Sequence, residues 1–286
     1  MTTWESSDKL IKKEIIQKGS FSQKPTEMSA CNVYIDNLKS VNLSVEQIKN
    51  YLHSEIIEAA GIQVIVIGHA CSTVDRCIER AVQTMSLNEQ SLTTIKVIPN
   101  DLAMEKIILT LELTLKSCEF YKPIWLWTEE EKYENAMKYK LKGVELFKAK
   151  RIVDAFYRFS KACKILITLE PLEDIDKPLE YKIVELKHIL YNNMAECQLI
   201  RKNYDNAIAL CCKVLAKEEN NVKALYRRGV AYGNLRNYKK AIDDLKIVVY
   251  LEPNNSRALE KFNYYNEQWR SSVHAYEDMV RKMFKV

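Results

Sequence analysis

The chain has 286 residues, long enough for one large domain or two ordinary ones, and its 47% hydrophobic and 28% charged residues are typical of a folded soluble protein. It contains only six glycines and six prolines, a scarcity that disfavours glycine-rich phosphate loops and turn-dense all-β folds. No run of about 18 apolar residues occurs and the first residues lack the apolar core of a signal peptide, so we expect a cytoplasmic protein, with the nucleus open as a second compartment.

The charge is divided unevenly along the chain. Residues 1–120 carry a net charge of −3, whereas residues 121–286 carry +8 and most of the aromatic side chains. A basic region can attract nucleic acid, membranes or acidic peptides, so the arrangement of its charges has to decide among them. Because no nucleic-acid module and no membrane-spanning segment accompany the surplus, we expect neither nucleic acid nor membrane as a partner.

The first half has the pattern of a sheet with segregated helices. Four segments are short, apolar and strand-like: 31–35, 62–67, 92–97 and 107–115. The last of them alternates apolar residues with a largely polar face, as a half-buried antiparallel strand does. Two helices are predicted between the strands, one over 44–60 that opens with a Ser44–Gln47 capping box and one over 75–85. This order predicts an α+β domain with an antiparallel sheet.

The second half contains a repeat. The small residues Gly229 and Ala241 have small counterparts 34 residues earlier, Ala195 and Ala207. An earlier copy of the same repeat contains Gly143. A 34-residue period with small residues at these positions resembles the tetratricopeptide repeat, TPR, in which paired helices approach closely. We therefore predict an all-α domain of three repeats, with these approximate bounds: 136–169, 188–221 and 222–255. Pro171 and Pro178 predict a loop in the extra length between the first two repeats.

One long helical pattern follows the last repeat over 256–286. Aromatic and aliphatic residues recur there every three or four positions, which predicts an amphipathic helix of about 30 residues. Its first expected role is to cover the end of the repeat stack, because a terminal repeat leaves an apolar face open. Binding of a partner by its distal end is the alternative.

The sequence predicts no metal site, no disulfide and no cofactor. Eight cysteines occur without a C-x-x-C pair, and the four histidines are widely spread. We therefore expect reduced, mostly buried thiols. No Ser/His/Asp, paired-carboxylate or nucleotide-binding motif is present.

Several strings resemble FKBP-type immunophilins that carry C-terminal TPRs. They are LIKKEIIQKG followed by C-x-V-x-I, AVQTMSLNEQSLTTI, and WLWTEEEKYENAMKYKLKGVELFKAK. The resemblance covers nearly all of the second half and patches of the first. Within this family, the sequence is most similar to degenerate co-chaperones of the Bride of Doubletime type. This resemblance implies a degenerate FKBP-like domain over 1–120 and a connector over 121–135 that leads into the first repeat helix.

The resemblance also implies that the isomerase pocket is lost. In FKBPs an aromatic box surrounds the prolyl amide, but three of its positions match Ile35, Ile65 and Ile78 here. The motif aspartate matches Glu79, and the late alanine–tyrosine–glycine motif is absent around 98–104. Rotation about the prolyl bond faces a barrier of about 18–20 kcal/mol. A site that lacks most of its box is expected to lower this barrier little, so we predict no peptidyl-prolyl isomerase activity.

In the TPRs of Hsp90 co-chaperones, a carboxylate clamp grips an acidic C-terminal peptide. Matched position by position, the clamp would consist here of Lys140, Asn193, Lys223 and Arg227. Val144 stands where the clamp has an asparagine. A lost hydrogen bond to a charged group is worth roughly 1.5–3 kcal/mol, or about 10- to 150-fold in affinity. The resemblance therefore implies weakened binding of an Hsp90-type C-terminus.

The leading hypothesis is a non-enzymatic co-chaperone or adaptor. Its TPR groove would hold an acidic chaperone terminus, and its FKBP-like domain would hold a client protein, a kinase if the narrower resemblance applies. Two alternatives stay open. One is an active peptidyl-prolyl isomerase, and the other is a TPR scaffold that works independently of Hsp90.

Overall fold

The computed structural model describes residues 2–41, 53–57, 61–97 and 107–284. The chain divides into two compact units, Met1–Trp127 and Thr128–Val286, which we call the sheet unit and the helical unit. Within the described ranges, no helix is both long enough and apolar enough to cross a membrane.

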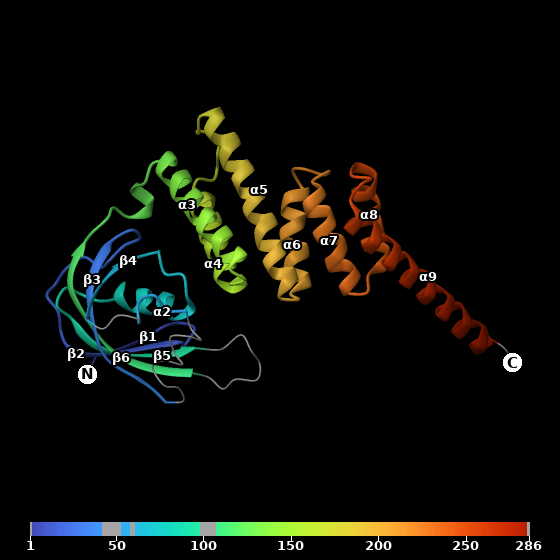
Figure 1. Ribbon diagram of the computed structural model, residues 1–286. Coiled ribbons are helices and arrows are strands. Elements are labelled where there is room, and N and C mark those ends of the chain that lie inside the picture. The colour runs from blue at the N-terminus through green and yellow to red at the C-terminus, as the bar shows by residue number, and fades with distance from the viewer. Residues whose placement is uncertain (1, 42–52, 58–60, 98–106, 285–286) are drawn as a thin grey trace. The chain divides into compact units, whose positions relative to one another are not determined.

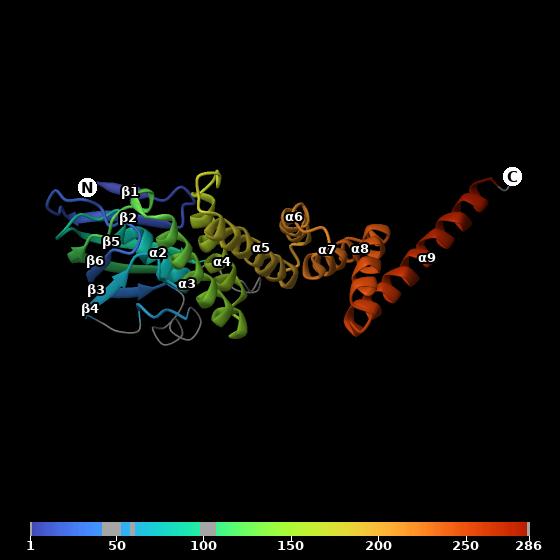
Figure 2. The ribbon, with the colours of Figure 1, turned by 90° about the horizontal axis from the view of Figure 1, so that it is seen from above.

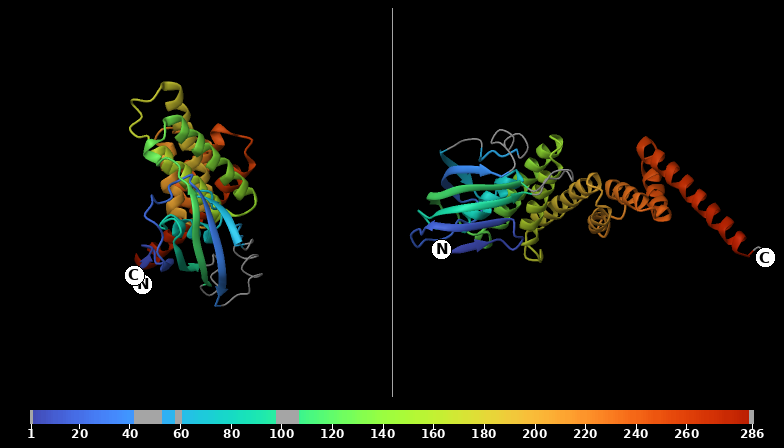
Figure 3. Two further views of the ribbon diagram at one scale, coloured as in Figure 1. Left: turned by 90° about the vertical axis from the view of Figure 1, so that its left-hand side faces the viewer. Right: turned by 90° about the horizontal axis from the view of Figure 1, so that it is seen from below.

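The sheet unit is built on one curved antiparallel sheet (Figure 1). Its strands are β1 (Thr3–Glu5), β2 (Ile11–Gln17), β3 (Ala30–Ser40), β4 (Gly61–Val66), β5 (Gln90–Val97) and β6 (Ile107–Glu119). They lie in the order β1-β2-β5-β6-β3-β4, so the long strands β3 and β6 are neighbours and β1 and β4 form the edges. Two views at one scale show the sheet from other sides (Figure 3).

The core of the sheet unit lies between the inner face of the sheet and helix α2 (Thr73–Val82). Buried and half-buried residues alternate strictly along β5, because successive side chains of a strand point to opposite faces. Helix α2 begins at Ser72, whose hydroxyl accepts a hydrogen bond from the backbone N–H of Asp75. Its buried face includes Ile78 and Ala81 and packs on the sheet, as the 3.6-residue spacing predicts.

The helix predicted over 44–60 falls mostly outside the described residues. Residues 53–57 are described and are not helical, so that prediction was wrong at its end. The local reason is that His53 has a φ of 47°, in the left-handed region, which ends regular helix. The Ser54 hydroxyl then accepts a hydrogen bond from the N–H of Ile57 and donates one to Asp75, which fixes a turn.

The helical unit consists of consecutive helix pairs (Figure 2). Its helices are α3 (Glu129–Lys148), α4 (Ile152–Ile167), α5 (Lys177–Ile200), α6 (Tyr204–Leu215), α7 (Val222–Asn234), α8 (Tyr238–Leu251) and α9 (Ser256–Phe284). Each helix packs on the next, and the first helices of successive pairs also meet, α3 with α5 and α5 with α7. The predicted fold class, an antiparallel sheet with a short helix followed by TPR-type helices, is confirmed.

The small residues of the repeat pattern lie where helices approach most closely. A Cβ atom on Gly143 of α3 would come within 2.5 Å of the Phe159 ring on α4. A Cβ atom on Gly229 of α7 would lie 3.0 Å from Leu245 of α8. The glycines therefore permit the interhelical distance on which the repeat depends.

The loop between α4 and α5 is shorter than the prolines predicted. Pro171 lies in it, but Pro178 is in the first turn of α5. Proline is compatible with that position because its fixed φ suits a helix and the first-turn N–H has no intrahelical partner. Helix α5 therefore begins about three turns before the predicted start of the second repeat.

The long C-terminal helix is confirmed, and its first half covers the last repeat. Ala258 and Tyr265 of α9 are buried, and the Tyr265 ring lies so close to Gly233 that no Cβ would fit there. The side chains of Tyr276, Met283 and Phe284 are exposed. The covering role therefore belongs to the part of α9 that precedes Trp269.

Candidate peptide-binding site

The four predicted clamp residues lie on the first helices of the three pairs. Lys140 is on α3, Asn193 on α5, and Lys223 and Arg227 on α7. Lys223 and Arg227 are four residues apart, so both project from one side of α7. Among the described residues, the side chains of Lys140, Asn193 and Lys223 form no hydrogen bond or ion pair. Convergence of all four on one ligand stays a prediction.

The structure joins Arg227 to α5. The Nε of Arg227 lies 2.6 Å from Oε2 of Glu196, and its Nη1 donates a hydrogen bond of 3.2 Å to Oδ1 of Asn192. Both partners are on α5, on either side of Asn193 in sequence. The guanidinium therefore faces the helix that carries the predicted asparagine, but it contacts that residue's neighbours.

Sequence reasoning missed Glu196. It lies three residues after Asn193, and positions three apart share one helix face. The side chain of Arg227 is 16% exposed and that of Glu196 is 35% exposed, so the ion pair is partly shielded from water. Burial raises the pKa of the nearby Tyr226, and the Glu196 carboxylate raises it further. The Glu196 carboxylate is thus already paired with Arg227, the cation that the predicted clamp would use to bind a peptide.

The adjacent Arg228 has a different role. Its Nε and Nη2 each donate a hydrogen bond of 2.8 Å to the carboxylate of Asp244 on α8, a bidentate pair. The hydrogen bonds that Arg228 donates to Asp244 hold the pKa of the guanidinium well above its usual range. Arg228 therefore ties α7 to its own partner helix, which leaves Arg227 as the arginine of this pair that faces α5.

Val144 is the residue that the sequence matches to the missing asparagine of the clamp. It lies one turn after Lys140 on α3 and is half-buried. An aliphatic side chain there cannot donate a hydrogen bond to a carboxylate. The two predicted clamp positions on α3 thus hold one cation and no amide.

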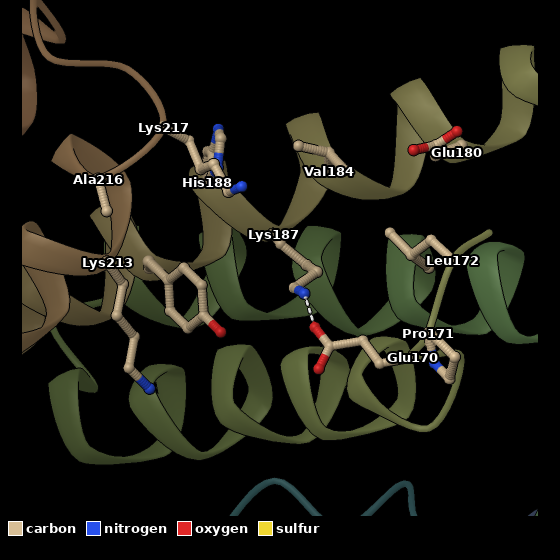
Figure 4. Close-up of a pocket in the computed structure, with 11 residues that line it drawn as sticks. Glu170, Pro171, Leu172, Glu180, Val184, Lys187, His188, Lys213, Ala216 and Lys217 are labelled. Atoms are coloured by element: carbon tan, nitrogen blue, oxygen red, sulfur yellow. Dashed lines mark hydrogen bonds and ion pairs between the residues drawn. The ribbon is translucent and has the colours of Figure 1, made fainter.

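A hollow of about 800 Å³ lies against α5 (Figure 4). Its lining includes Lys187, whose ammonium points to the Glu170 carboxylate and forms an ion pair with it. His188 is paired with Glu218, and the ammonium of Lys213 lies 5.1 Å from the centre of the Tyr191 ring. The lining lysine Lys187 is thus neutralised by Glu170, and the lining also contains the carboxylate of Glu180. This hollow is therefore a weaker candidate for an acidic peptide than the face that carries Arg227.

The three predicted pocket positions of the sheet unit are core residues. Ile35, Ile65 and Ile78 are 7%, 3% and 0% exposed and belong to one hydrophobic cluster. Among the described residues, the fully buried part of that cluster contains no aromatic side chain, and Trp4 only packs against it from a partly exposed position. The predicted loss at 98–104 lies outside the described residues. Aliphatic packing therefore occupies the three positions that the sequence matches to rings of an FKBP; the match itself stays a prediction.

Glu79, which matches the motif aspartate, has a local structural contact. Its Oε1 accepts a hydrogen bond of 2.6 Å from the backbone N–H of Ala70, and the residue is 7% exposed. This bond ties α2 to the segment that follows β4. It points to a role in the fold of the sheet unit.

Models of three domain families match the chain. The BDBT FKBP-like N-terminal family matches residues 4–120, the Bride of doubletime-like TPR domain matches residues 128–209, and the tetratricopeptide repeat matches residues 222–255. The sheet unit is thus an FKBP-like domain and the helical unit a TPR domain.

Curated relatives from animals match the chain. Protein Bride of doubletime of Drosophila melanogaster is 26% identical over 293 residues, which cover 99% of this chain and 98% of that protein. The human FK506-binding protein-like is 34% identical over 172 residues, which cover 60% of this chain and 46% of that protein. The chain spans only 39–46% of the length of the FK506-binding protein-like and FK506-binding protein 59 relatives that it matches.

A solved structure agrees with the fold. The crystal structure of residues 1–211 of CG17282 aligns with a TM-score of 0.58 at 24% identity and covers 71% of this chain and 96% of that chain. This likeness concerns the fold alone.

Proposed function

Because the chain joins an FKBP-like domain of the Bride of doubletime type to a TPR domain, we propose that it is a non-enzymatic co-chaperone adaptor. Its ligand is the acidic C-terminus of an Hsp90-type chaperone, held on the clamp face. We define the clamp face as the side of α3, α5 and α7 that carries Lys140, Asn193, Lys223 and Arg227. The client protein binds the FKBP-like domain.

The observation that carries the proposal is the pairing of Arg227 with Glu196. The Arg227 guanidinium reaches across from α7 to α5 and holds a carboxylate at 2.6 Å. In the described part of the chain, Glu196 and Asn192 engage two of the five N–H groups of this guanidinium, so three remain for a peptide carboxylate. Lys140 and Lys223, which have no ion-pair partner among the described residues, supply further positive charge for an acidic ligand.

The described core of the sheet unit supports the absence of catalysis. Prolyl isomerisation in FKBPs depends on an aromatic cavity, and Ile35, Ile65 and Ile78 are instead packed in an aliphatic core. We expect no acceleration of prolyl rotation in a proline-peptide assay. Clear turnover, sensitive to an FK506-type macrolide, would favour the isomerase alternative.

The sheet unit offers an exposed apolar edge for a client. Ile62 and Val64 of the edge strand β4 are 64% and 68% exposed, and Tyr34 of β3 lies opposite Ile62 in the register. Isolated apolar residues are common on surfaces, whereas exposed apolar side chains on two adjoining strands form a patch that a partner protein can cover. We place the client, a kinase in the narrower proposal, on this edge.

A calorimetric titration tests the chaperone part. The full chain is titrated with a short acidic peptide from an Hsp90-type C-terminus. We expect weak saturable binding that Arg227→Ala abolishes and that Val144→Asn strengthens about 10- to 150-fold, since the asparagine restores a hydrogen bond to a charged group. Absence of heat at millimolar peptide, with the wild-type chain folded, would favour the Hsp90-independent scaffold.

A further inference from the structure

Two thiols of the sheet unit lie in direct contact. Cys31 of β3 and Cys118 of β6 are partners in the antiparallel register, and their sulfur atoms are 3.4 Å apart. Both are free cysteines. No other pair of cysteine sulfurs among the described residues makes such a contact.

The backbone geometry suits a bond between them. Ser29 accepts a hydrogen bond from the N–H of Ile67 on the β4 side. Because backbone groups alternate in direction along a strand, Cys31 also directs its N–H and C=O toward β4. Cys31 and Cys118 are therefore a non-hydrogen-bonded pair, in which Cα atoms are about 4.5 Å apart. Disulfides span Cα distances of about 4.4–6.8 Å, so little backbone movement is required.

The two thiols differ in access. Cys31 is 0% exposed, whereas Cys118 is half-buried at the end of β6. Burial raises the pKa of Cys118, but hydrogen bonds from Cys31 and from the Ser29 hydroxyl act in the opposite direction. Burial and the contact with Cys118 both raise the pKa of Cys31. A reagent from solution thus meets Cys118 first, and Cys31 lies within reach as the second thiol.

We propose that Cys31 and Cys118 form a redox site at which a hydroperoxide produces a reversible disulfide. The Cys118 thiolate attacks one oxygen of the peroxide, so an S–O bond forms, the O–O bond breaks, and water or an alcohol leaves. The Cys31 sulfur then attacks the Cys118 sulfenic acid, an S–S bond forms, and the S–O bond breaks with loss of water. Two thiols are oxidised by two electrons, and the peroxide is reduced.

The bond would reinforce the place where the chain leaves the sheet. The N–H of Tyr121 donates a hydrogen bond of 3.0 Å to Ser29, and the Thr26 hydroxyl donates one of 2.6 Å to the Tyr121 carbonyl. A covalent bond at Cys118 adds to these contacts. Because it closes a loop of 88 residues, about two thirds of the sheet unit, we expect it to raise the melting temperature of that unit by about 10 °C or more.

The experiment oxidises the full chain with hydrogen peroxide, alkylates the remaining thiols after unfolding, and maps the cross-links by mass spectrometry of a non-reducing digest. The background is Cys212→Ser, because Cys212 is exposed and would join two chains. We expect a peptide pair linked through Cys31 and Cys118, two fewer alkylated thiols than in the reduced protein, and full recovery after dithiothreitol. The rate should rise with pH, since the thiolate is the attacking form.

Matched variants separate the proposal from general oxidation. Cys118→Ser should abolish the cross-link and leave Cys31 alkylatable. Cys31→Ser should leave a Cys118 sulfenic acid that dimedone traps. The inference is overturned if Cys31 and Cys118 stay fully alkylatable under peroxide that oxidises Cys212 in the wild type. It is equally overturned if Cys118 is converted to sulfinic acid with no link to Cys31.

Discussion

The ion pair between Arg227 and Glu196 makes a quantitative prediction for peptide binding. On the clamp face, Glu196 competes with the peptide carboxylate for the same guanidinium, which it holds at 2.6 Å. Glu196→Gln removes the competing charge but keeps the size of the side chain. We therefore expect this variant to bind the acidic peptide more tightly than the wild type.

The magnitude follows from two effects. Breaking an exposed ion pair costs about 0.2–1 kcal/mol, and the partial burial of this pair places it at the upper end of that range. Repulsion between Glu196 and a nearby peptide carboxylate adds a term of similar size near a protein surface. A total of about 1–2 kcal/mol corresponds to a gain in affinity of about 5- to 30-fold.

The assay is calorimetry of the full chain with the acidic peptide, repeated at two salt concentrations. The matched control is Glu180→Gln, which makes the same charge change on the same helix but lines the hollow on its other side. The control should shift the affinity less than twofold. Equal gains from both variants would mean that only net charge matters, and weaker binding by Glu196→Gln would refute the assignment of Arg227 to the peptide.

Two further predictions concern the stability of each unit. Gly143→Ala should lower the stability of the helical unit by about 1–2 kcal/mol in thermal unfolding, because the overpacking against Phe159 exceeds the gain in helix propensity. The control is Gly229→Ala, which should be close to neutral because the nearest neighbour of Gly229 is farther away. Equal losses of stability in the two variants would contradict the packing account. Hydrogen bonds from Arg80 and Ser6 lower the pKa of Asp8 in the folded protein. The ionised carboxylate therefore stabilises the fold above its pKa in the unfolded chain, about 3.9, and this stabilisation is lost as the pH falls through the pKa of the folded protein. Asp8→Asn should therefore destabilise the sheet unit by about 1 kcal/mol or less at pH 7, measured by hydrogen exchange. The difference from the wild type should fade below about pH 4. A difference that does not change with pH would contradict the role given to the Asp8 carboxylate.

The fold was largely predictable because its strongest signals are periodic. The two-residue alternation of β6 and the 34-residue spacing of Gly229 and its counterparts each report a packing requirement that the structure contains. The misjudged parts have local causes that periodicity does not reveal. The turn at His53 depends on one left-handed residue, and β1 has only three residues, too few for a pattern.

The candidate site was predictable only in outline. Matching to a family motif singled out Arg227, which the structure shows in contact with α5, but the match compares five positions and ignores the residues between them. The pairing of Arg227 with Glu196 joins positions 31 apart on different helices, so the sequence contains no local trace of it. A check of the charged residues one turn away from each motif position would have identified Glu196 as a candidate.

The central claim is that the clamp face binds a terminal carboxylate. The most direct test is a nuclear magnetic resonance titration of the full chain with two acidic peptides that differ only at the C-terminus, a free acid and an amide. The free acid should shift the side-chain signals of Arg227 and Asn193, and the amide should shift them little. Equal responses to both peptides, or shifts confined to residues around Lys187 and Lys213, would contradict the account.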